Sequence, residues 1–261
     1  MRDHMTIDLR LGNCLDLAKQ LEDNTINVTV TSPPYNKCGV GGGLFRKIKY
    51  DTFDDTLPEE EYQKQQIELL NTLFDKTVEG GSLFYNHKVR YFEGGAISPW
   101  AWLTQTKWHI REEIIWARGS GPEISGYRFI QNDERIYWLC KGKKHPRLPR
   151  ECANYGSVWK FGPDMKNDHP APYPLMLPVR CIQAVLQEPG LVFDPYNGSG
   201  TTGVAAKLLG HEYIGFDVSE KYIEEARERI TNTTDRDLKK FNECAMITSP
   251  NQSSLEALFN A

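Results

Sequence analysis

One short stretch of the chain, TSPPY at residues 31–35, combines side chains that could hold a planar amino group. It follows residues 27–30, which alternate polar and β-branched apolar residues as strands do. Because proline cannot donate to a β-ladder, the strand must end at Ser32. The Ser32 hydroxyl and the Pro33 carbonyl can both accept hydrogen bonds from one amino group, and Tyr35 offers a face for stacking a base. The stretch therefore predicts a clamp for an amine, with a prolyl turn and a packed tyrosine as the alternative.

A glycine loop in the last third of the chain could hold a nucleotide-like cofactor. Its glycines, in the pattern G-x-G-x-x-G between a strand and a helix, are Gly198, Gly200 and Gly203. Asp217 ends the next strand, 19 residues after Gly198, where an acid can hold two ribose hydroxyls. Asp194 would repel a pyrophosphate but suits a cofactor that carries an ammonium or sulfonium group. The pattern favours S-adenosylmethionine over NAD, with an ordinary glycine turn as the alternative.

Strand-like and helix-like segments alternate along the chain, which indicates an α/β domain. We expect strands within residues 6–11, 27–31, 82–89, 111–119, 128–142, 191–194 and 212–217. We expect helices within residues 13–21, 57–78, 181–188, 201–210 and 219–230, the second of them ended by Gly80 and Gly81. In one parallel sheet, the TSPPY corner would lie at the carboxyl end of its strand, beside the cofactor crevice.

Length and composition limit the class of protein. With 261 residues, 39% hydrophobic and 25% charged, the chain can bury one sizeable core, and it has no run of about 18 apolar residues to span a membrane. The polar start MRDHMTIDLR lacks the apolar segment of a signal peptide, so we expect a cytoplasmic protein. Six cysteines without a C-x-x-C pair, and histidines without metal spacing, predict no metal site. The net charge of −4 means that local basic patches would have to meet any polyanion.

Four motifs make the chain resemble the DNA amino-methyltransferases of restriction-modification systems, which methylate the exocyclic amine of cytosine or adenine. They are TSPPY at 31–35, HPAPYPLMLPVRCI at 169–182, FDPYNGSGTTG at 193–203 and YIGFD at 213–217. The resemblance extends from about Leu9 to Ile230, and the catalytic motif precedes the cofactor motif as in the β group, a circular permutation of the usual order. It implies one catalytic domain over residues 1–261 with an S-adenosylmethionine-dependent methyltransferase (Rossmann-like) α/β fold. It also implies a mixed seven-stranded sheet with one antiparallel strand, and a target base flipped out of double-stranded DNA.

The resemblance also assigns roles to residues. Binding and orienting the target base would belong to Ser32, Pro33, Pro34 and Tyr35. The cofactor would be held by Asp194, Tyr196, Gly198, Ser199, Gly200, Thr201 and Asp217, with His169 and Pro170 lining the site from the other side. Two departures from the family pattern are Gly12-Asn13, where Gly-Asp is common, and Tyr196, where phenylalanine is common. A contact from the first of these turns to the adenine moiety is therefore not implied.

DNA contacts are expected from two basic patches, which occur although the net charge of the chain is −4. The first, in a glycine-containing stretch that would act as a flap over a flipped base, contains Lys37, Arg46, Lys47 and Lys49. The second, in an irregular section at residues 141–178 that is our candidate target-recognition region, contains Lys141, Lys143, Lys144, Arg147 and Arg150. Each patch could neutralise phosphates, although a charge run such as the second is often only a solvated surface.

The predicted reaction is methyl transfer from S-adenosylmethionine to an exocyclic amine in a specific duplex sequence. Within the resemblance, serine at the first motif position more often accompanies cytosine N4 methylation and aspartate accompanies adenine N6. We therefore favour cytosine N4 and keep adenine N6 as the alternative. An RNA or protein amino-methyltransferase would use the same fold, and a dinucleotide-binding dehydrogenase would leave TSPPY as packing. A cognate restriction endonuclease would be a further partner.

Overall fold

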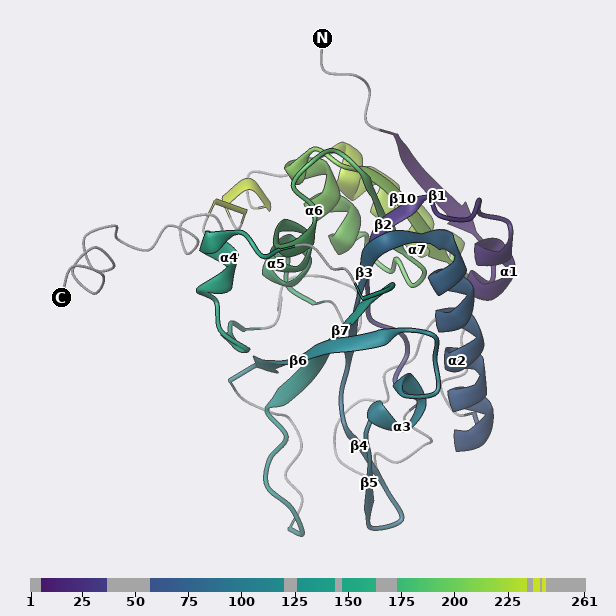
Figure 1. The fold of residues 1–261 in the computed structure, drawn as a ribbon, viewed down its shortest axis with the longest axis vertical. Helices are drawn as coiled ribbons and strands as arrows, with labels where there is room; N and C mark the ends of the chain where they lie inside the picture. The colour runs from purple at the N-terminus through teal and green to yellow at the C-terminus, as the bar shows by residue number, and fades with distance from the viewer. Residues whose placement is uncertain are drawn as a thin grey trace, which may run out of the picture.

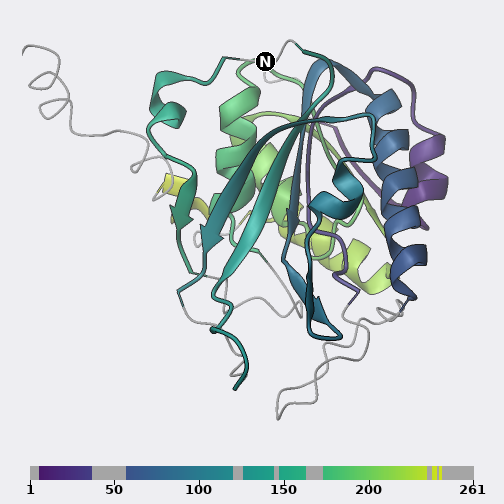
Figure 2. The ribbon, with the colours of Figure 1, turned by 60° about the horizontal axis from the view of Figure 1, so that its bottom comes forward.

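The computed structural model describes residues 6–36, 57–119, 126–143, 147–162, 173–233, 237–239 and 241–242. A central sheet is covered on both faces by helices (Figure 1, Figure 2). The helices are α1 (Cys14–Lys19), α2 (Glu59–Lys76), α3 (Trp100–Leu103), α4 (Arg150–Ala153), α5 (Met176–Val185), α6 (Thr201–Leu209) and α7 (Glu220–Thr231). One hydrophobic cluster joins α1, α2 and α3 to the sheet, and a second joins α5, α6 and α7 to its other face. The predicted α/β class is therefore confirmed.

The sheet has the strand order β1-β10-β9-β2-β3-β7-β6-β8. Its strands are β1 (Ile7–Leu11), β2 (Ile26–Thr31), β3 (Thr77–His87), β6 (His109–Ala117), β7 (Asp133–Cys140), β8 (Val158–Lys160), β9 (Leu191–Asp194) and β10 (Glu212–Asp217). All neighbours are parallel except at β7, which runs antiparallel to β3 and β6. The predicted single antiparallel strand is present, but the predicted count of seven strands is wrong, because the sheet has eight strands within the described residues alone. The additional β8 is three residues long, too short to show a period in the sequence.

Helix α2 ends earlier than the glycine pair predicts. It stops at Lys76, and β3 begins at once with Thr77, whose backbone is extended. β-Branched Thr77 and Val78 favour a strand, which explains why the helix does not reach Gly80 and Gly81. A Cβ on Gly81 would lie 3.0 Å from the Asn27 carbonyl oxygen, so this glycine allows the close approach of β2. The two glycines thus lie within the strand and do not end the helix.

Helix α5 is also displaced from its predicted range of 181–188. It begins at Met176 and ends at Val185, and Leu186 is already extended. Pro178 lies within its first turn, where the missing backbone donor costs no helical hydrogen bond. None of the helices in the described part of the chain is long and apolar enough to cross a membrane.

The topology brings two chain turns together at one end of the sheet. Strands β2 and β9 are parallel neighbours, with Val28 opposite Val192. The chain leaves β9 for α6 on one face of the sheet and leaves β2 for α2 on the other. In open α/β sheets, ligands bind at such a switch point, outside the carboxyl ends of the strands. We call this end, where β2, β3, β9 and β10 finish, the carboxyl end of the sheet.

A short hairpin extends this end of the molecule. It consists of β4 (Arg90–Phe92) and β5 (Gly95–Ile97) and follows β3 directly. The connection between β6 and β7 projects from the same end (Figure 1). Both segments therefore extend beyond the carboxyl end, where a large substrate would approach.

Candidate active site

The TSPPY corner lies at the carboxyl end of β2, as the sequence predicts. Ser32 and Tyr35 are half-buried there, and their hydroxyl oxygens are 3.0 Å apart. The Tyr35 hydroxyl also lies 3.1 Å from Asn86 Oδ1 and 2.9 Å from Glu134 Oε2. The Pro34 carbonyl accepts a hydrogen bond of 2.8 Å from the Tyr62 hydroxyl. The corner is thus held by side chains from three other elements.

One face of the Tyr35 ring lies against His87. The two ring centroids are 4.6 Å apart with planes inclined by 42°. His87 is fully buried, its Nδ1 donates to the Lys88 carbonyl at 2.7 Å, and burial lowers its pKa to about 3. A neutral imidazole therefore supports the ring at neutral pH. Base stacking on Tyr35, which the sequence predicts, would have to use the opposite face or the ring edge.

Asp194 ends β9 but is not open to a ligand. Its side chain is fully buried, and its oxygens accept hydrogen bonds from three hydroxyls and one backbone N–H. The donors are Thr31 (2.8 Å), Tyr173 (2.9 Å), Thr202 (2.8 Å) and the Tyr196 N–H (3.0 Å). Burial raises the pKa of Asp194 to about 6, against the lowering effect of these bonds. The predicted ion pair with a cofactor ammonium would require one of these donors to be replaced.

The glycine loop takes the predicted shape. Gly198 and Gly200 have φ values of 50° and 75°, in the left-handed region that favours glycine. The Gly198 N–H donates to Asp217 Oδ2 at 2.8 Å, and the Ser219 N–H donates to Asp217 Oδ1 at 2.9 Å. Burial raises the pKa of Asp217. Since a carboxylate has about four acceptor positions, half-buried Asp217 can still accept from ribose hydroxyls.

Other predicted cofactor residues have protein partners. Arg229 on α7 donates to the hydroxyls of Ser199 (3.2 Å) and Thr201 (3.0 Å). Each of these hydroxyls accepts from Arg229 and keeps its own proton, which it could still donate to a cofactor. The Tyr196 hydroxyl accepts from Gln66 Nε2 at 3.3 Å. His169 and Pro170 lie outside the described residues.

The close packing of the glycine loop gives a stability prediction. A Cβ on Gly200 would lie 2.9 Å from Ala226 Cβ and 3.2 Å from Ala226 Cα on helix α7, whereas a Cβ on Gly210, at the other end of α6, would meet nothing within 4 Å. Both glycines have a left-handed φ, so alanine strains both backbones similarly. We expect Gly200→Ala to lower the free energy of unfolding by about 1–2 kcal/mol more than Gly210→Ala, because only the first overpacks. Urea unfolding of both variants measures this, and equal losses would contradict it.

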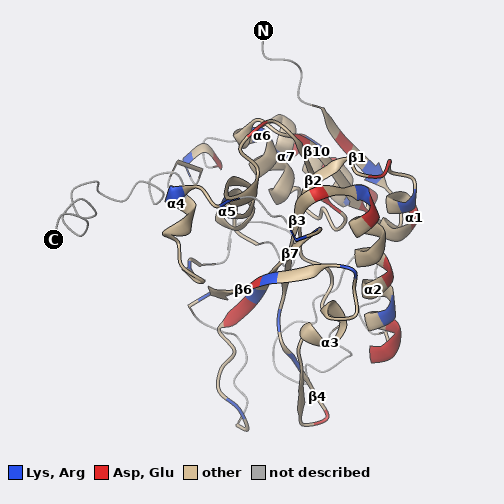
Figure 3. Ribbon diagram, viewed as in Figure 1, with Lys and Arg blue, Asp and Glu red and all other residues tan. Residues whose placement is uncertain are grey.

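The second basic patch is not at the site. Lys141 directly follows β7. Its Nζ donates to Asn24 Oδ1 (2.9 Å), just before β2, and to the carbonyl of Thr77 (2.7 Å), the first residue of β3. Lys143 lies beside it, and Arg147 and Arg150 lie before β8, in or near α4 at the opposite end of the sheet (Figure 2, Figure 3). The antiparallel direction of β7 thus places Lys141 and Lys143 at the end of the sheet opposite the corner, and their contact with DNA stays a prediction. Lys37, Arg46, Lys47, Lys49 and Lys144 lie outside the described residues.

Several residues that build the candidate site carry no signal in the sequence. Asn86 and Glu134 are 51 and 99 residues from Tyr35 in the chain, and no local pattern marks them. Thr31 and Tyr173 lie within quoted motifs, but their shared contact with Asp194 follows only from the fold. Among the described residues, no group of three or more His, Cys, Asp or Glu side chains is placed to hold a metal ion.

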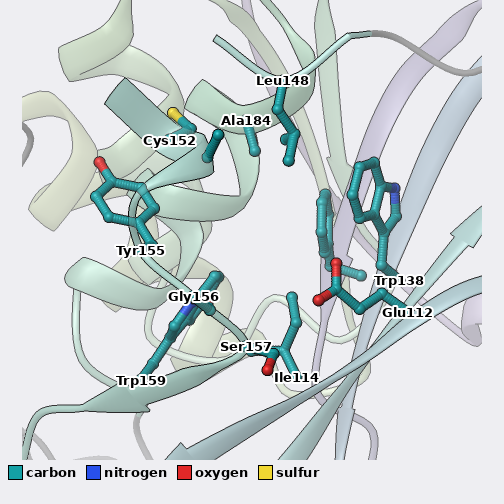
Figure 4. Close-up of a pocket in the computed structure, with 12 residues that line it drawn as sticks. Glu112, Ile114, Trp138, Leu148, Cys152, Tyr155, Gly156, Ser157, Trp159 and Ala184 are labelled. Atoms are coloured by element: carbon teal, nitrogen blue, oxygen red, sulfur yellow. The ribbon is translucent and has the colours of Figure 1, made fainter. Parts of the chain in front are cut away.

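A cavity of about 170 Å³ lies elsewhere, between β6, β7, α4 and β8 (Figure 4). Glu112, Trp138 and Tyr155 are among the residues that line it, and none of the corner or glycine-loop residues does. It is therefore separate from the candidate active site.

The fold and the site define an α/β enzyme with a nucleoside-cofactor loop beside a corner of hydrogen-bond acceptors. A family model described as DNA methylase matches residues 26–228, most of the chain. The chain belongs to this family. It is therefore a DNA amino-methyltransferase of the restriction-modification type that uses S-adenosylmethionine, and the dehydrogenase alternative no longer applies.

Relatives of known type match over most of their own length. The chain is 26% identical to the type II methyltransferase M.SmaI of Serratia marcescens, over 84% of this chain and 89% of the relative. It is 29% identical to M.HpaI of Haemophilus parainfluenzae, over 86% of this chain and 74% of the relative. Among solved structures, the PvuII DNA methyltransferase, titled cytosine-N4-specific, has a TM-score of 0.68 at 17% identity and covers 93% of both chains. A DNA modification methylase from Thermus thermophilus has a TM-score of 0.67 at 21% identity, with 88% of this chain and 96% of that chain covered.

The residues present fit the cofactor. The left-handed glycines let the loop backbone approach a ligand closely, and Asp217 ends β10 where ribose hydroxyls could donate to it. Asp194 lies behind this surface and holds the loop through the Tyr196 N–H. The loop and Asp217 would thus hold the nucleoside, while Asp194 would position them.

Proposed function

We propose that the enzyme methylates N4 of cytosine in a specific sequence of double-stranded DNA, with the target base flipped out of the duplex. The observation that carries this proposal is the half-buried Ser32 hydroxyl at the carboxyl end of β2, beside the β9 strand that leads into the cofactor loop. A neutral serine at this position accompanies cytosine N4 methylation more often than adenine N6. The PvuII DNA methyltransferase, similar in fold, is cytosine-N4-specific.

The chemistry asks mainly for positioning. S-adenosylmethionine supplies an already activated methyl group, so the protein must place the amine nitrogen in line with it. The Ser32 hydroxyl and the Pro33 carbonyl would accept the two amine hydrogens and turn the nitrogen lone pair toward the methyl group. The amine proton becomes acidic only as transfer proceeds, so no strong base is needed in advance.

The test of this proposal is the identity of the methylated nucleoside. The enzyme would be incubated with methyl-labelled S-adenosylmethionine and unmethylated duplex DNA of mixed sequence, then the DNA digested and its nucleosides measured by mass spectrometry. Label in N4-methylcytosine supports the proposal. Label in N6-methyladenine would leave the enzyme class and overturn the base assignment. Label only in an RNA or protein substrate offered in parallel would overturn the DNA substrate.

For the DNA contacts, we propose the two segments that extend beyond the carboxyl end of the sheet. Tyr127 and Phe129 are fully exposed, and Tyr91 on the β4–β5 hairpin is partly exposed. The Arg128 guanidinium lies 4.4 Å from the Tyr91 ring centroid, so the two segments are in contact. Aromatic side chains stack on unpaired bases or insert between base steps, which suits strand separation around a flipped base. We call Tyr91, Tyr127 and Phe129 the aromatic tips.

The aromatic tips give a testable prediction. We expect the double variant Tyr127→Ala/Phe129→Ala to raise the KM for duplex DNA about tenfold or more, since each base stack contributes about 1–3 kcal/mol. Binding of S-adenosylmethionine should stay within about twofold, because the tips are remote from the glycine loop. Lys107→Ala is the control, since Lys107 is exposed just before β6, at the end of the sheet opposite the tips, and should leave KM unchanged. An equal effect of both substitutions would contradict the assignment.

A further inference from the structure

The hydrogen bonds around Tyr35 fix the direction of the Ser32 hydroxyl. A phenol has one proton, and two of its neighbours, Asn86 Oδ1 and Glu134 Oε2, can only accept it. Asn86 cannot turn its amide, because its Nδ2 donates to the Arg135 backbone carbonyl at 3.1 Å, and a carbonyl only accepts. Glu134 Oε1 forms an ion pair with the Arg118 guanidinium, which leaves Oε2 to accept from Tyr35. The single Tyr35 proton is therefore donated toward Glu134 Oε2 and Asn86 Oδ1, and it is not available to Ser32.

It follows that Ser32 donates to Tyr35. In their contact of 3.0 Å one oxygen must donate, and the Tyr35 proton is already used. The Ser32 proton thus points at Tyr35, and the Ser32 lone pairs are the part left for a ligand. A hydroxyl can ordinarily donate or accept, but this network makes Ser32 an acceptor.

We propose that Glu134 is a positioning residue that sets the polarity of the active site, through Tyr35, so that Ser32 selects an amino group over a carbonyl at the same position of the base. This inference rests on the proposed function and deepens it. Glu134 is buried on β7 and would not itself touch the substrate. A base with an amino group satisfies Ser32, whereas a base with a carbonyl there would bring two acceptors together and leave both unpaired. The same polarity serves cytosine or adenine.

The test uses Glu134→Gln, which keeps the size of the side chain. A glutamine amide can donate to the Tyr35 oxygen, which frees the Ser32 proton to point at the ligand. We expect kcat to fall about tenfold, with the affinity for S-adenosylmethionine within about twofold of the wild type. The matched control is Glu113→Gln on the adjacent strand, because Glu113 also pairs with an arginine, Arg135 at 2.8 Å, and accepts from Trp100 Nε1 instead of from Tyr35.

The decisive readout is base discrimination, which a merely structural role would not change. Once labelling has located the methylated position, binding is measured for duplexes with the amino base there and with its deaminated form, uracil for cytosine or hypoxanthine for adenine. We expect the wild type and Glu113→Gln to prefer the amino base about tenfold or more, and Glu134→Gln to keep only the part of that preference that the Pro33 carbonyl provides. Unchanged discrimination in Glu134→Gln, or the same loss in Glu113→Gln, would overturn the inference. Failure of the proposed cytosine assignment would show separately, as label in N6-methyladenine.

Discussion

Ser32→Ala is expected to lower kcat for methyl transfer about 100- to 1,000-fold, the usual cost of removing one hydrogen-bonding group aimed at the reacting atoms. The alanine variant can no longer accept an amine hydrogen, so the nitrogen lone pair loses its alignment with the methyl group. Its fold should persist, because Tyr35 keeps its contacts with Asn86 and Glu134. Single-turnover transfer of labelled methyl to duplex DNA measures the effect.

Two measurements make this result specific to the corner. Binding of S-adenosylmethionine to Ser32→Ala should stay within about twofold of the wild type, because the cofactor loop follows a different strand, β9. Ser32→Thr keeps the hydroxyl and should retain most of the rate that alanine loses. A loss of less than about threefold in Ser32→Ala would show that the corner is not the amine acceptor.

Local signals in the sequence located the two strand ends that form the candidate site. TSPPY and the glycine loop each mark the end of a strand, because proline stops a ladder and glycine allows a left-handed turn. Their adjacency followed from the general rule for parallel sheets and is confirmed by the pairing of Val28 with Val192. The parts of the site that depend on one chain turn were therefore predictable.

The parts that depend on strand register were not predictable. Glu134 reaches Tyr35 only because β7 is antiparallel to β3 with His87 opposite Arg135. A slip of one residue would move Glu134 to the other face of the sheet. Because β7 is antiparallel, Lys141 and Lys143 lie at the end of the sheet opposite the TSPPY corner, although their charge suggested DNA binding. Charge in a sequence does not state which end of a sheet it occupies.

Asp194 shows a different limit of the sequence. The position of an acid at the end of β9 was correct, but its partners come from separate parts of the chain, Thr31 at the end of β2, Tyr173 before α5 and Thr202 in α6. These donors cannot be identified from the sequence, so the sequence alone assigns the Asp194 carboxylate to the cofactor. In the structure, Asp194 instead joins the corner strand to the cofactor loop.

Asp194→Ala is therefore expected to lower the free energy of unfolding by about 3 kcal/mol at pH 7. The substitution removes the shared acceptor of four buried donors, and each buried donor left without a partner costs about 1–3 kcal/mol. The loss should fall below the sum of these costs, because Tyr173 and Thr202 remain paired with each other. Affinity for S-adenosylmethionine should fall as well, since the Tyr196 N–H no longer anchors the loop. Urea unfolding and cofactor titration measure the two effects.

Asp194→Asn removes the charge of the side chain and keeps its shape. The pH dependence of the unfolding free energy then shows how much the ionisation of Asp194 contributes to stability. Burial raises the pKa of Asp194 to about 6 from its ordinary value of 3.8, so between these values the folded protein holds a proton that the unfolded chain has released. This contribution is fully present below pH 3.8 and is lost as the pH rises through 6. The unfolding free energy of the wild type minus that of Asp194→Asn should therefore fall by about 2 kcal/mol between pH 4.5 and pH 7. Taking the difference removes the titration of groups that both proteins share, His87 included. A flat difference would mean that the Asp194 carboxylate gains as much from its four donors as it loses by burial, so that its ionisation would neither stabilise nor destabilise the fold.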